Sequence, residues 1–441
     1  MLSPADAALV QRDPHLPGLA LLLDPAAMLE TLQRQVEPVQ IEAMQPTYLR
    51  YKPGTSCLAA YRVCAGGAVV NIYAKAYRAG DTAKLGKAQQ HQAGGFLGFG
   101  VALLENAGVA IYDFPNDRGL AGLKKLNRPD SRHRLLTKAL PRQPELWAAA
   151  VHGLRYKPER RYVAQLVTEA GPQAVLKFYT PAGYEVAARN SRALASLKEI
   201  GLAPALGRSS RAGVLAHSWL DGQSLDEAIR TGGVETGQVE AVGAALARLH
   251  HHRLTELTYR GRSDEVNAWL AAAGSVAAVC PPLAEQAKRL ARRLGTILQD
   301  APLQIQTIHG DFSSDQVMLT STGPAFLDFD RAGLGDPAAD IGSFIAHLES
   351  RVLAGALSPI WVSNLIETFI TGYRQVGQGH LPPRLNLYLS AGLLQLAPQP
   401  FRHRAANWPE QTQALLQRAE EILNNGSFDL EQIDNLRPVC I

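Results

Sequence analysis

An internal repeat constrains the fold of this chain more than any other feature of its sequence. The run Leu49–Pro53, LRYKP, recurs as Leu154–Pro158. After each copy come two apolar runs of strand length, and the second run of each pair contains a lysine, Lys75 or Lys177. Ordered self-similarity of this kind indicates two structural units of one design. We therefore predict two small twisted sheets, each with a helix.

The two copies divide the chain into four predicted regions. These are a helical lead-in at 1–40, the first copy at 41–140, the second copy at 141–221 and a mainly helical region at 222–441. A further strand of the first copy, Val109–Asp113, is aligned with Leu215–Trp219 of the second. The fold class is predicted as α+β, and 441 residues suffice for two or three folding units.

The first copy has no counterpart of the polar motifs that follow the second copy. Its helix region, 81–94, contains no glutamate, so Lys75 lacks an evident partner there. We expect a non-catalytic duplicate that packs on the rest of the chain or forms a homodimer with a second chain. The alternative is a regulatory ligand held by Arg50, Lys52 and Lys75.

Bulk composition narrows the classes of function. The chain is 46% hydrophobic and 19% charged, as in a soluble globular protein, and its net charge of +4 comes without a Lys/Arg block, so nucleic acid is not predicted as a partner. No run of about 18 apolar residues exists, which argues against a membrane location. The four scattered cysteines indicate free thiols in a reducing cytoplasm; they are Cys57, Cys64, Cys280 and Cys440.

The stretch Ile305–Asp340 contains the residues whose types and spacing indicate a catalytic site. It contains His309-Gly310-Asp311, then Asp315-Gln316, then Asp328-Phe329-Asp330 around two short apolar runs at 317–319 and 325–327. These runs predict a β-hairpin with a turn at 321–324 and with polar groups at its ends. Phosphoryl transfer needs this set of groups: a carboxylate that orients the attacking hydroxyl, and oxygen ligands for Mg²⁺.

The motifs of this stretch carry a resemblance to a known family. The spacing follows the His-x-Asp, four residues, Asn and later Asp of protein kinases. With Gly310 inside the first motif, and with Gly335-Asp336-Pro337 after Asp328-Phe329-Asp330, the stretch resembles the aminoglycoside phosphotransferase and choline kinase family. That resemblance implies a kinase-like fold of a small sheet lobe and a mainly helical lobe, here preceded by a degenerate second copy of the small lobe.

The resemblance also implies roles for single residues. Asp311 would be the catalytic base, and His309 a support for its loop. Gln316 and Asp328 would bind Mg²⁺, with Asp330 as a further candidate. The expected asparagine is Gln316 in this chain, whose longer amide still offers a carbonyl oxygen; Asp315 is an alternative ligand. Asp340 would anchor the catalytic loop.

The second copy contains the residues expected to bind the nucleotide. Its first turn, within Arg155–Arg161, would lie over the phosphates, with positive charge from Lys157, Arg160 and Arg161. The alternative is that these side chains are only solvated at a hairpin tip. Lys177 lies in an apolar run, where an unpaired ammonium is costly to bury. The resemblance assigns it to the α- and β-phosphates.

The resemblance also implies that a glutamate of the next helix pairs with Lys177. We expect that helix at about 184–200, ended by Gly201 and Pro204, and its expected glutamate position falls near Asn190. Glu185 is therefore the candidate partner. The hinge with the helical region is predicted at 221–224, where Asp221 would lie close to the purine.

The predicted reaction is transfer of the γ-phosphoryl group of ATP (or GTP) to a hydroxyl of a small molecule, with Mg²⁺. The resemblance favours a sugar, aminocyclitol or amino alcohol as the acceptor. The alternative is an inactive, nucleotide-binding scaffold or sensor, favoured by Gln316 and the missing helix glutamate. A protein kinase is disfavoured, because 330–336 is too short to seat a peptide. The run His250–His252 is interpreted as polar residues near a helix end and not as a metal site.

Overall fold

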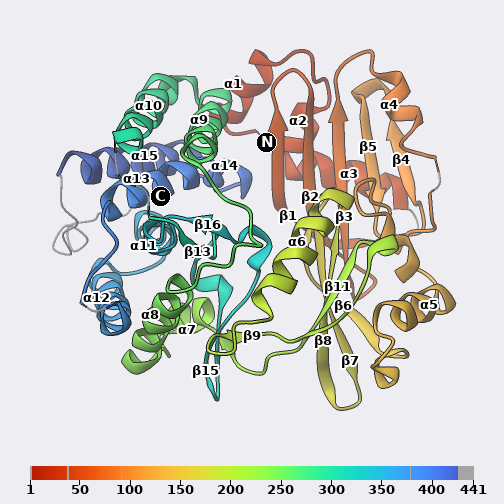
Figure 1. Cartoon of the computed structure of the whole chain (residues 1–441). Coiled ribbons are helices and arrows are strands. Elements are labelled where there is room, and N and C mark those ends of the chain that lie inside the picture. Colours follow the sequence, from red (N-terminus) through yellow and green to blue (C-terminus); the bar gives the residue numbers. More distant parts are fainter. Residues whose placement is uncertain are drawn as a thin grey trace. The chain divides into compact units, whose positions relative to one another are not determined.

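The computed structural model describes residues 2–36, 39–90, 92–300, 302, 304–377 and 379–425. It confirms the predicted α+β class (Figure 1). Cys440 lies outside the described residues. The chain forms two compact units: unit 1 comprises 1–185, 205–219 and 401–406, and unit 2 the rest. No described helix combines the length and apolarity that crossing a bilayer requires.

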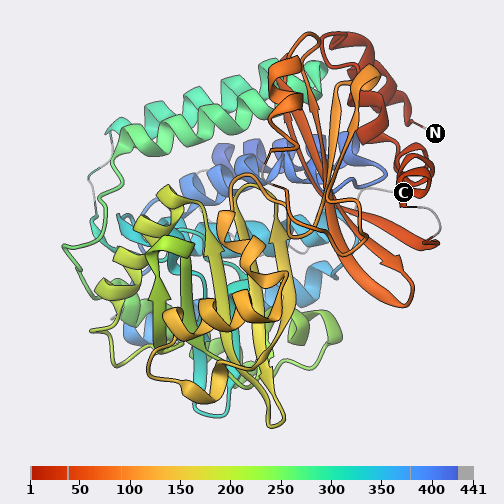
Figure 2. The same cartoon turned by 90° about the vertical axis from the view of Figure 1, so that its right-hand side faces the viewer.

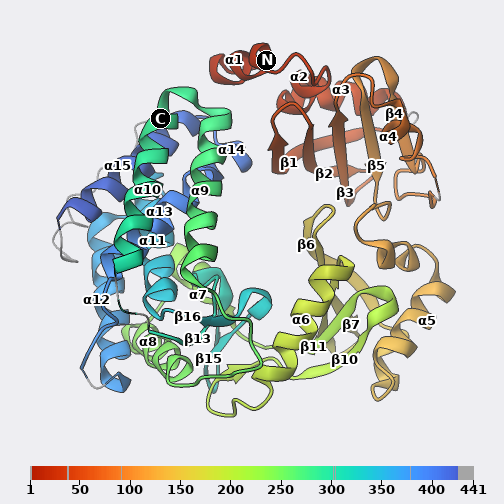
Figure 3. The same ribbon diagram turned by 45° about the horizontal axis from the view of Figure 1, so that its top comes forward.

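Unit 1 begins with three helices, α1 (Pro4–Arg12), α2 (Leu19–Leu23) and α3 (Pro25–Val36). Ser3 caps α1 by accepting a hydrogen bond from the amide of Asp6. Helices α2 and α3 pack against one face of the first sheet, as Figure 3 shows. The helical lead-in expected from the sequence is thus helical.

The first sheet consists of five antiparallel strands in the order β1-β2-β3-β5-β4. They are β1 (Ile41–Lys52), β2 (Ser56–Ala65), β3 (Ala68–Tyr77), β4 (Val101–Leu104) and β5 (Val109–Asp113). The short helix α4 (Thr82–Gly86) lies between the third and fourth strands in the chain.

The second sheet has the same strand order, β6-β7-β8-β11-β10. Its strands are β6 (Ala150–Lys157), β7 (Arg161–Thr168), β8 (Gly171–Tyr179), β10 (Ala205–Ser209) and β11 (Val214–Ser218). Helix α5 (Pro129–Ala139) precedes the sheet, and α6 (Pro181–Leu194) takes the place of α4 in the chain order. Identical order supports the interpretation as a repeat; duplication of the lobe itself stays a prediction.

One detail of the predicted alignment between the copies is wrong by one residue. A 3₁₀ turn precedes the fifth strand of each sheet and closes on a glycine with positive φ, Gly108 at 61° and Gly213 at 63°. The strand that follows Gly108 begins at Val109, and the strand that follows Gly213 begins at Val214. Val109 therefore corresponds to Val214 and not to Leu215.

The two sheets share one hydrophobic core within unit 1. The first sheet contributes the face that carries Lys75, including Leu58, Tyr73 and Tyr112, whereas the second contributes the face opposite to Lys177, including Leu176. Alternate residues of a strand point to opposite faces, which assigns each side chain to its side.

Unit 2 is mainly helical and forms its own core. Its helices are α7 (Leu225–Thr231), α8 (Thr236–His250), α9 (Arg262–Val279), α10 (Ala284–Asp300), α11 (Ala338–Leu353), α12 (Pro359–Val376), α13 (Leu385–Leu396) and α15 (Trp408–Asn424). The short helix α14 (Gln399–Arg402) crosses the division between the units. Figure 2 shows α9 and α10 running side by side as a long pair.

Two small sheets of unit 2 carry the polar motifs. One has the order β12-β14-β15-β9, with β12 (Gln223–Ser224), β14 (Val317–Thr320), β15 (Gly323–Phe326) and β9 (Gly201–Leu202). The other pairs β13 (Gln306–Ile308) with β16 (Gly333–Gly335). The expectation that the helix of 184–200 ends at Gly201 is wrong: α6 ends at Leu194, because the chain turns there and pairs with β15 as a strand.

Candidate functional site

The predicted β-hairpin of unit 2 is confirmed as β14 and β15. Val317 pairs with Phe326, and beyond this pair the amide of Leu327 donates to the carbonyl oxygen of Gln316 at 2.8 Å. Gln316 and Asp328 therefore leave the hairpin at the same end. The strand register thus brings the backbones of two motifs to one end of the hairpin.

A buried carboxylate fixes the backbone of the loop that begins at His309. Asp340, on α11, accepts the amide of His309 at 2.6 Å with one oxygen and the amide of Gly310 at 2.8 Å with the other. His250 Nε2 contacts Asp340 at 3.0 Å, and His250 Nδ1 contacts the Tyr373 hydroxyl at 2.9 Å. The interpretation of all three histidines as polar residues of a helix end is therefore incomplete, since His250 is buried in this network.

Asp340 is ionised in this setting. Its burial by itself favours the neutral acid, but the hydrogen bond and charge of His250, together with His309, hold the pKa below its ordinary value. An ionised carboxylate is a stronger acceptor than a neutral one. The predicted anchoring of this loop by Asp340 is observed in these bonds, and the catalytic role of the loop stays a prediction.

Gly310 lies where a side chain has no room. Its φ is +77°, and a Cβ atom would lie 2.2 Å from the carbonyl oxygen of Arg331. Arg260 donates to the carbonyl oxygens of both Gly310 and Arg331. The glycine thus lets two loops approach closely, and Arg260 joins them.

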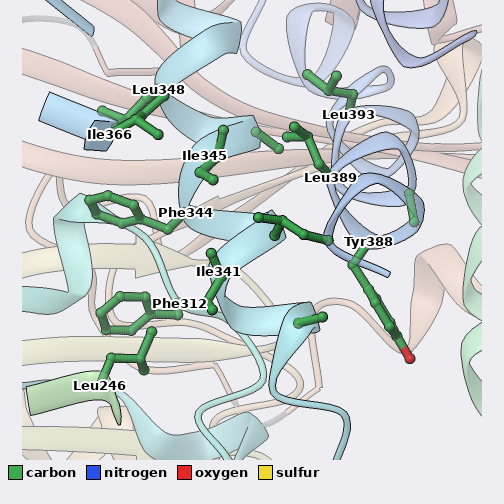
Figure 4. Packing of buried hydrophobic residues seen from close by; sticks show 14 of the residues in the cluster. Leu246, Phe312, Ile341, Phe344, Ile345, Leu348, Ile366, Tyr388, Leu389 and Leu393 are labelled. Atoms are coloured by element: carbon green, nitrogen blue, oxygen red, sulfur yellow. The ribbon is translucent and has the colours of Figure 1, made fainter. Parts of the chain in front are cut away.

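Asp311 and Phe312 are placed in opposite environments. The Asp311 carboxylate accepts from Arg331 at 2.9 Å and is about half exposed. The ring of Phe312 is fully buried, beside Leu246 and Phe344 in the core of unit 2 (Figure 4). The buried ring anchors the chain directly after the carboxylate, which leaves Asp311 accessible on a fixed backbone.

His309 makes contacts within its own loop region. Its Nε2 lies 2.7 Å from the carbonyl oxygen of Leu327, and its ring packs on Phe329 with centroids 4.6 Å apart. These contacts connect the start of the loop to the end of the hairpin. They favour the support function that the resemblance implies, which stays a prediction.

The segment Asp328–Asp330 is positioned by α6. Asp328 has a φ of 64°, a left-handed conformation that is uncommon outside glycine. The buried Asn190 donates to the carbonyl oxygen of Phe329 at 3.0 Å and of Ala332 at 3.2 Å. Asn190 occupies the position where the sequence comparison expects a glutamate, and here it binds this segment. The sequence signal for Asn190 was its position on the predicted helix, where the resemblance expects a glutamate.

Neighbouring contacts fix the turn that contains Gln316. The side chain of Gln316 is 7% exposed, and Asp315 accepts from the Ser313 hydroxyl at 2.6 Å. Ser314 donates to Asp226 of α7 at 2.7 Å, and Arg351 of α11 donates to the same oxygen. Sequence reasoning missed Asp226, Arg260 and Arg331, whose partners are all distant or in another motif.

The donor set around the hairpin suits a hard cation. Within the part of the chain that the structure describes, no group of three or more His, Cys, Asp and Glu side chains has metal-binding geometry. Magnesium, however, is often held by one or two carboxylates, with the remaining positions filled by phosphate oxygens and water. The carboxylate of Asp328 and the amide oxygen of Gln316 fit that requirement.

The residues assigned to the nucleotide lie mainly in unit 1. Lys177, on β8, is paired in register with Val163 and Leu215 on the neighbouring strands. Burial, and next the positive charge of Lys177, lower the pKa of His217 to about 4, so His217 is neutral.

The predicted basic turn is the β6–β7 hairpin turn. The backbones of Lys157 and Arg161 are in register across the two strands, and Arg160 is exposed. Glu185, on α6, is exposed, and its pairing with Lys177 stays a prediction. Asp221 is also exposed and comes two residues after Trp219, the last residue of that segment of unit 1.

Comparison with known proteins gives one family and several solved structures. The model of the phosphotransferase enzyme family matches residues 159–378. No curated protein is significantly similar to this sequence.

Three solved structures are similar over part of the chain. The macrolide 2'-phosphotransferase of Brachybacterium faecium is 20% identical, with 60% of this chain and 92% of that chain covered and a TM-score of 0.41. The choline/ethanolamine kinase family protein of Mesorhizobium loti is 15% identical, covering 70% and 99%, with a TM-score of 0.46. An amicoumacin kinase is 15% identical, covering 68% and 95%, with a TM-score of 0.48.

The matched residues include the polar motifs of Ile305–Asp340, the hairpin between them and Asp340. The α+β fold, with its antiparallel sheets and helical unit, agrees with the kinase-like fold that the motifs implied. Through residues 159–378, this chain belongs to the phosphotransferase enzyme family.

Proposed function

We propose that the chain is an active small-molecule kinase, which transfers the γ-phosphoryl group of ATP (or GTP) to a hydroxyl group. One observation carries this proposal: the exposed Asp311 carboxylate stands on a loop whose preceding amides are both bound by the buried Asp340. Catalysis of phosphoryl transfer depends mainly on positioning and on charge neutralisation. A loop fixed in this way supplies the positioning.

Asp311 acts as the base. Its carboxylate accepts the hydrogen bond of the acceptor hydroxyl and takes the proton as the oxygen attacks phosphorus. Arg331 holds the carboxylate in one orientation at 2.9 Å before the acceptor binds. The acceptor is a sugar, aminocyclitol or amino alcohol, as the resemblance implies.

Gln316 and Asp328 hold Mg²⁺, and Asp330 is a further candidate ligand. When bound, the cation neutralises negative charge on the phosphates. The left-handed backbone at Asp328 and the hydrogen bonds from Asn190 set the direction of this segment. In unit 1, Lys177 binds the α- and β-phosphates, and the β6–β7 turn adds Lys157, Arg160 and Arg161.

The test is Asp311→Asn in the full-length protein, assayed with Mg-ATP against a panel of sugars, aminocyclitols and amino alcohols. The amide keeps the shape but cannot take the proton, so turnover should fall at least about a hundredfold while nucleotide binding persists. Asp130→Asn, an exposed aspartate in the first turn of α5, is the matched control and should leave turnover unchanged. Unchanged turnover of Asp311→Asn would place the base elsewhere.

The second candidate function is an inactive nucleotide-binding scaffold. Asn190 favours it, because the expected glutamate is absent and the asparagine is engaged with Phe329. Slow hydrolysis of ATP with Mg²⁺ by the purified protein, and its loss in Asp328→Asn, separates the two. A scaffold shows no hydrolysis in either protein.

A further inference from the structure

The turn between β6 and β7 is bound by the first sheet through one glutamate. Glu159, at the tip of the turn, has a left-handed backbone with a φ of 59°. Its carboxylate accepts from Lys75 Nζ at 2.7 and 2.9 Å and from Arg50 at 2.6 Å. Lys75, which the sequence left without a partner, is paired in the structure with a residue 84 positions away.

A second carboxylate of the first copy binds the backbone of the same turn. Asp117 Oδ2 accepts the amide of Glu159 at 2.8 Å and the hydroxyl of Tyr156 at 2.7 Å. The other oxygen of Asp117 accepts the amides of Gly119 and Leu120. Both the main chain and the side chain of Glu159 are therefore fixed by residues that precede the second sheet.

These contacts are shielded from water. The exposed fraction is 14% for the Glu159 side chain and 17% each for Lys75 and Arg50. Charge pairs in such surroundings are screened less by salt than surface pairs, and removing one member leaves the others uncompensated. A left-handed conformation of a residue other than glycine persists only when its surroundings determine it.

The partners of Glu159 have counterparts in the second copy. Lys75 corresponds to Lys177, which binds phosphate in the proposed function, and Arg50 corresponds to Arg155. In the first copy, Arg50 and Lys75 bind the carboxylate of Glu159. A regulatory ligand on Arg50, Lys52 and Lys75 stays a prediction, and two of these three cations already contact Glu159.

We propose that the first sheet positions the β6–β7 turn for the nucleotide. Arg50 and Lys75 bind Glu159, and this holds the neighbouring Lys157, Arg160 and Arg161 in the arrangement that receives the phosphates. Glu159 is a positioning residue and touches no reacting atom. The inference rests on the proposed function, because it assigns the turn to phosphate binding.

The experiment compares Glu159→Gln and Lys75→Met with the control Lys84→Met in the full-length protein. Lys84 also forms an ion pair on the first copy, but the pair is exposed and its partner is Asp81 instead of Glu159. Hydrogen exchange of a peptide covering 156–162 should become at least about tenfold faster in both test variants and stay unchanged in the control. The KM for ATP should rise about five- to tenfold with kcat within about twofold, the pattern of lost ground-state binding.

The double variant should be no worse than Glu159→Gln alone, because that substitution already removes the ion pair with Lys75. Lys75→Arg keeps the charge and should retain most of the affinity. Unchanged exchange at 156–162 in Glu159→Gln overturns the proposal, and so does faster exchange with an unchanged KM for ATP. If the wild-type protein binds no nucleotide, the proposed function fails, and the exchange measurement still reports whether the first sheet orders the turn.

Discussion

The two five-stranded sheets have the same strand order but use their lysine-bearing faces in opposite ways. In the first sheet, Leu58, Tyr73 and Tyr112 share the face of Lys75 and are buried in the core. In the second, Val163 and Val175 share the face of Lys177 and are only partly buried. Strand order decides which side chains are neighbours, whereas packing decides whether a face can receive a ligand.

The aromatic residues of the first sheet illustrate this difference. Tyr73 and Tyr112 stack with centroids 4.3 Å apart, at the positions that Val175 and His217 occupy in the second sheet. Tyr156 packs edge-on against Tyr73. Aromatic rings therefore cover the Lys75 face of the first sheet. The proposed function requires that the corresponding face of the second sheet, which carries Lys177, is open to the nucleotide.

The largest expected difference between the two sheets is in stability, after removal of one of these aromatic rings. Tyr73 is fully buried, so Tyr73→Ala should lower the free energy of unfolding by about 3–5 kcal/mol, the range for losing a buried aromatic side chain. Val175→Ala at the corresponding position should cost about 1 kcal/mol or less, since that side chain is half-buried. Chemical denaturation of both variants measures the difference. Equal losses would mean that both faces are packed alike.

Exchanging the two lysines for methionine tests the difference in chemistry. Lys177→Met should lower kcat/KM for Mg-ATP at least about a hundredfold, which corresponds to about 2.7 kcal/mol of transition-state stabilisation. Lys75→Met should cost no more than about tenfold, because Lys75 acts only through Glu159. Steady-state kinetics at several ATP concentrations decide this. Similar losses for the two lysines would contradict the assignment of phosphate binding to the second sheet.

The smallest expected effect is a pH dependence from the first sheet. Burial raises the pKa of Asp113 from 3.8 to about 7, although the amides of Leu97 and its neighbours act to lower it. The unfolded chain loses this proton near pH 4 and the folded chain near pH 7, so the contribution of Asp113 to stability declines as pH rises between those values.

Asp113→Asn should remove this slope and stabilise the protein above pH 7 by on the order of 2 kcal/mol. Thermal unfolding between pH 4 and pH 8 measures the slope. The corresponding residue of the second sheet is Ser218, which does not ionise, so Ser218→Ala should leave the slope unaltered. A slope that persists in Asp113→Asn would assign it to another group, such as Glu265, whose burial raises its pKa to about 7 as well.

Local sequence signals predicted the elements whose pattern is set locally. The hairpin around Val317 and Phe326 follows from two short apolar runs and the turn between them. The helix predicted at 184–200 ends earlier, at Leu194, although Leu197 and Ile200 are buried as residues of a helical face would be. Residues 195–200 lead instead into Gly201–Leu202, which pair with β15 far along the chain.

The difference between local patterns and long-range contacts also explains which site residues the sequence predicts. Asp311 and Asp328 belong to motifs with fixed spacing, so their positions could be read from the sequence. Glu159 and Arg260 act through partners 84 and 50 residues away, respectively, and no local pattern marks such pairs. Long-range ion pairs and capping interactions become apparent only when the fold brings them together.

The occupied lysine face of the first sheet has a consequence for the number of ligands that the molecule takes up. A repeated sequence suggests two equivalent receptors, yet the carboxylate of Glu159 already satisfies the cations of one of them. A nucleotide analogue titrated into this protein should therefore saturate at a molar ratio of one. Glu159 of the second copy is thus the counter-ion of Arg50 and Lys75 of the first copy.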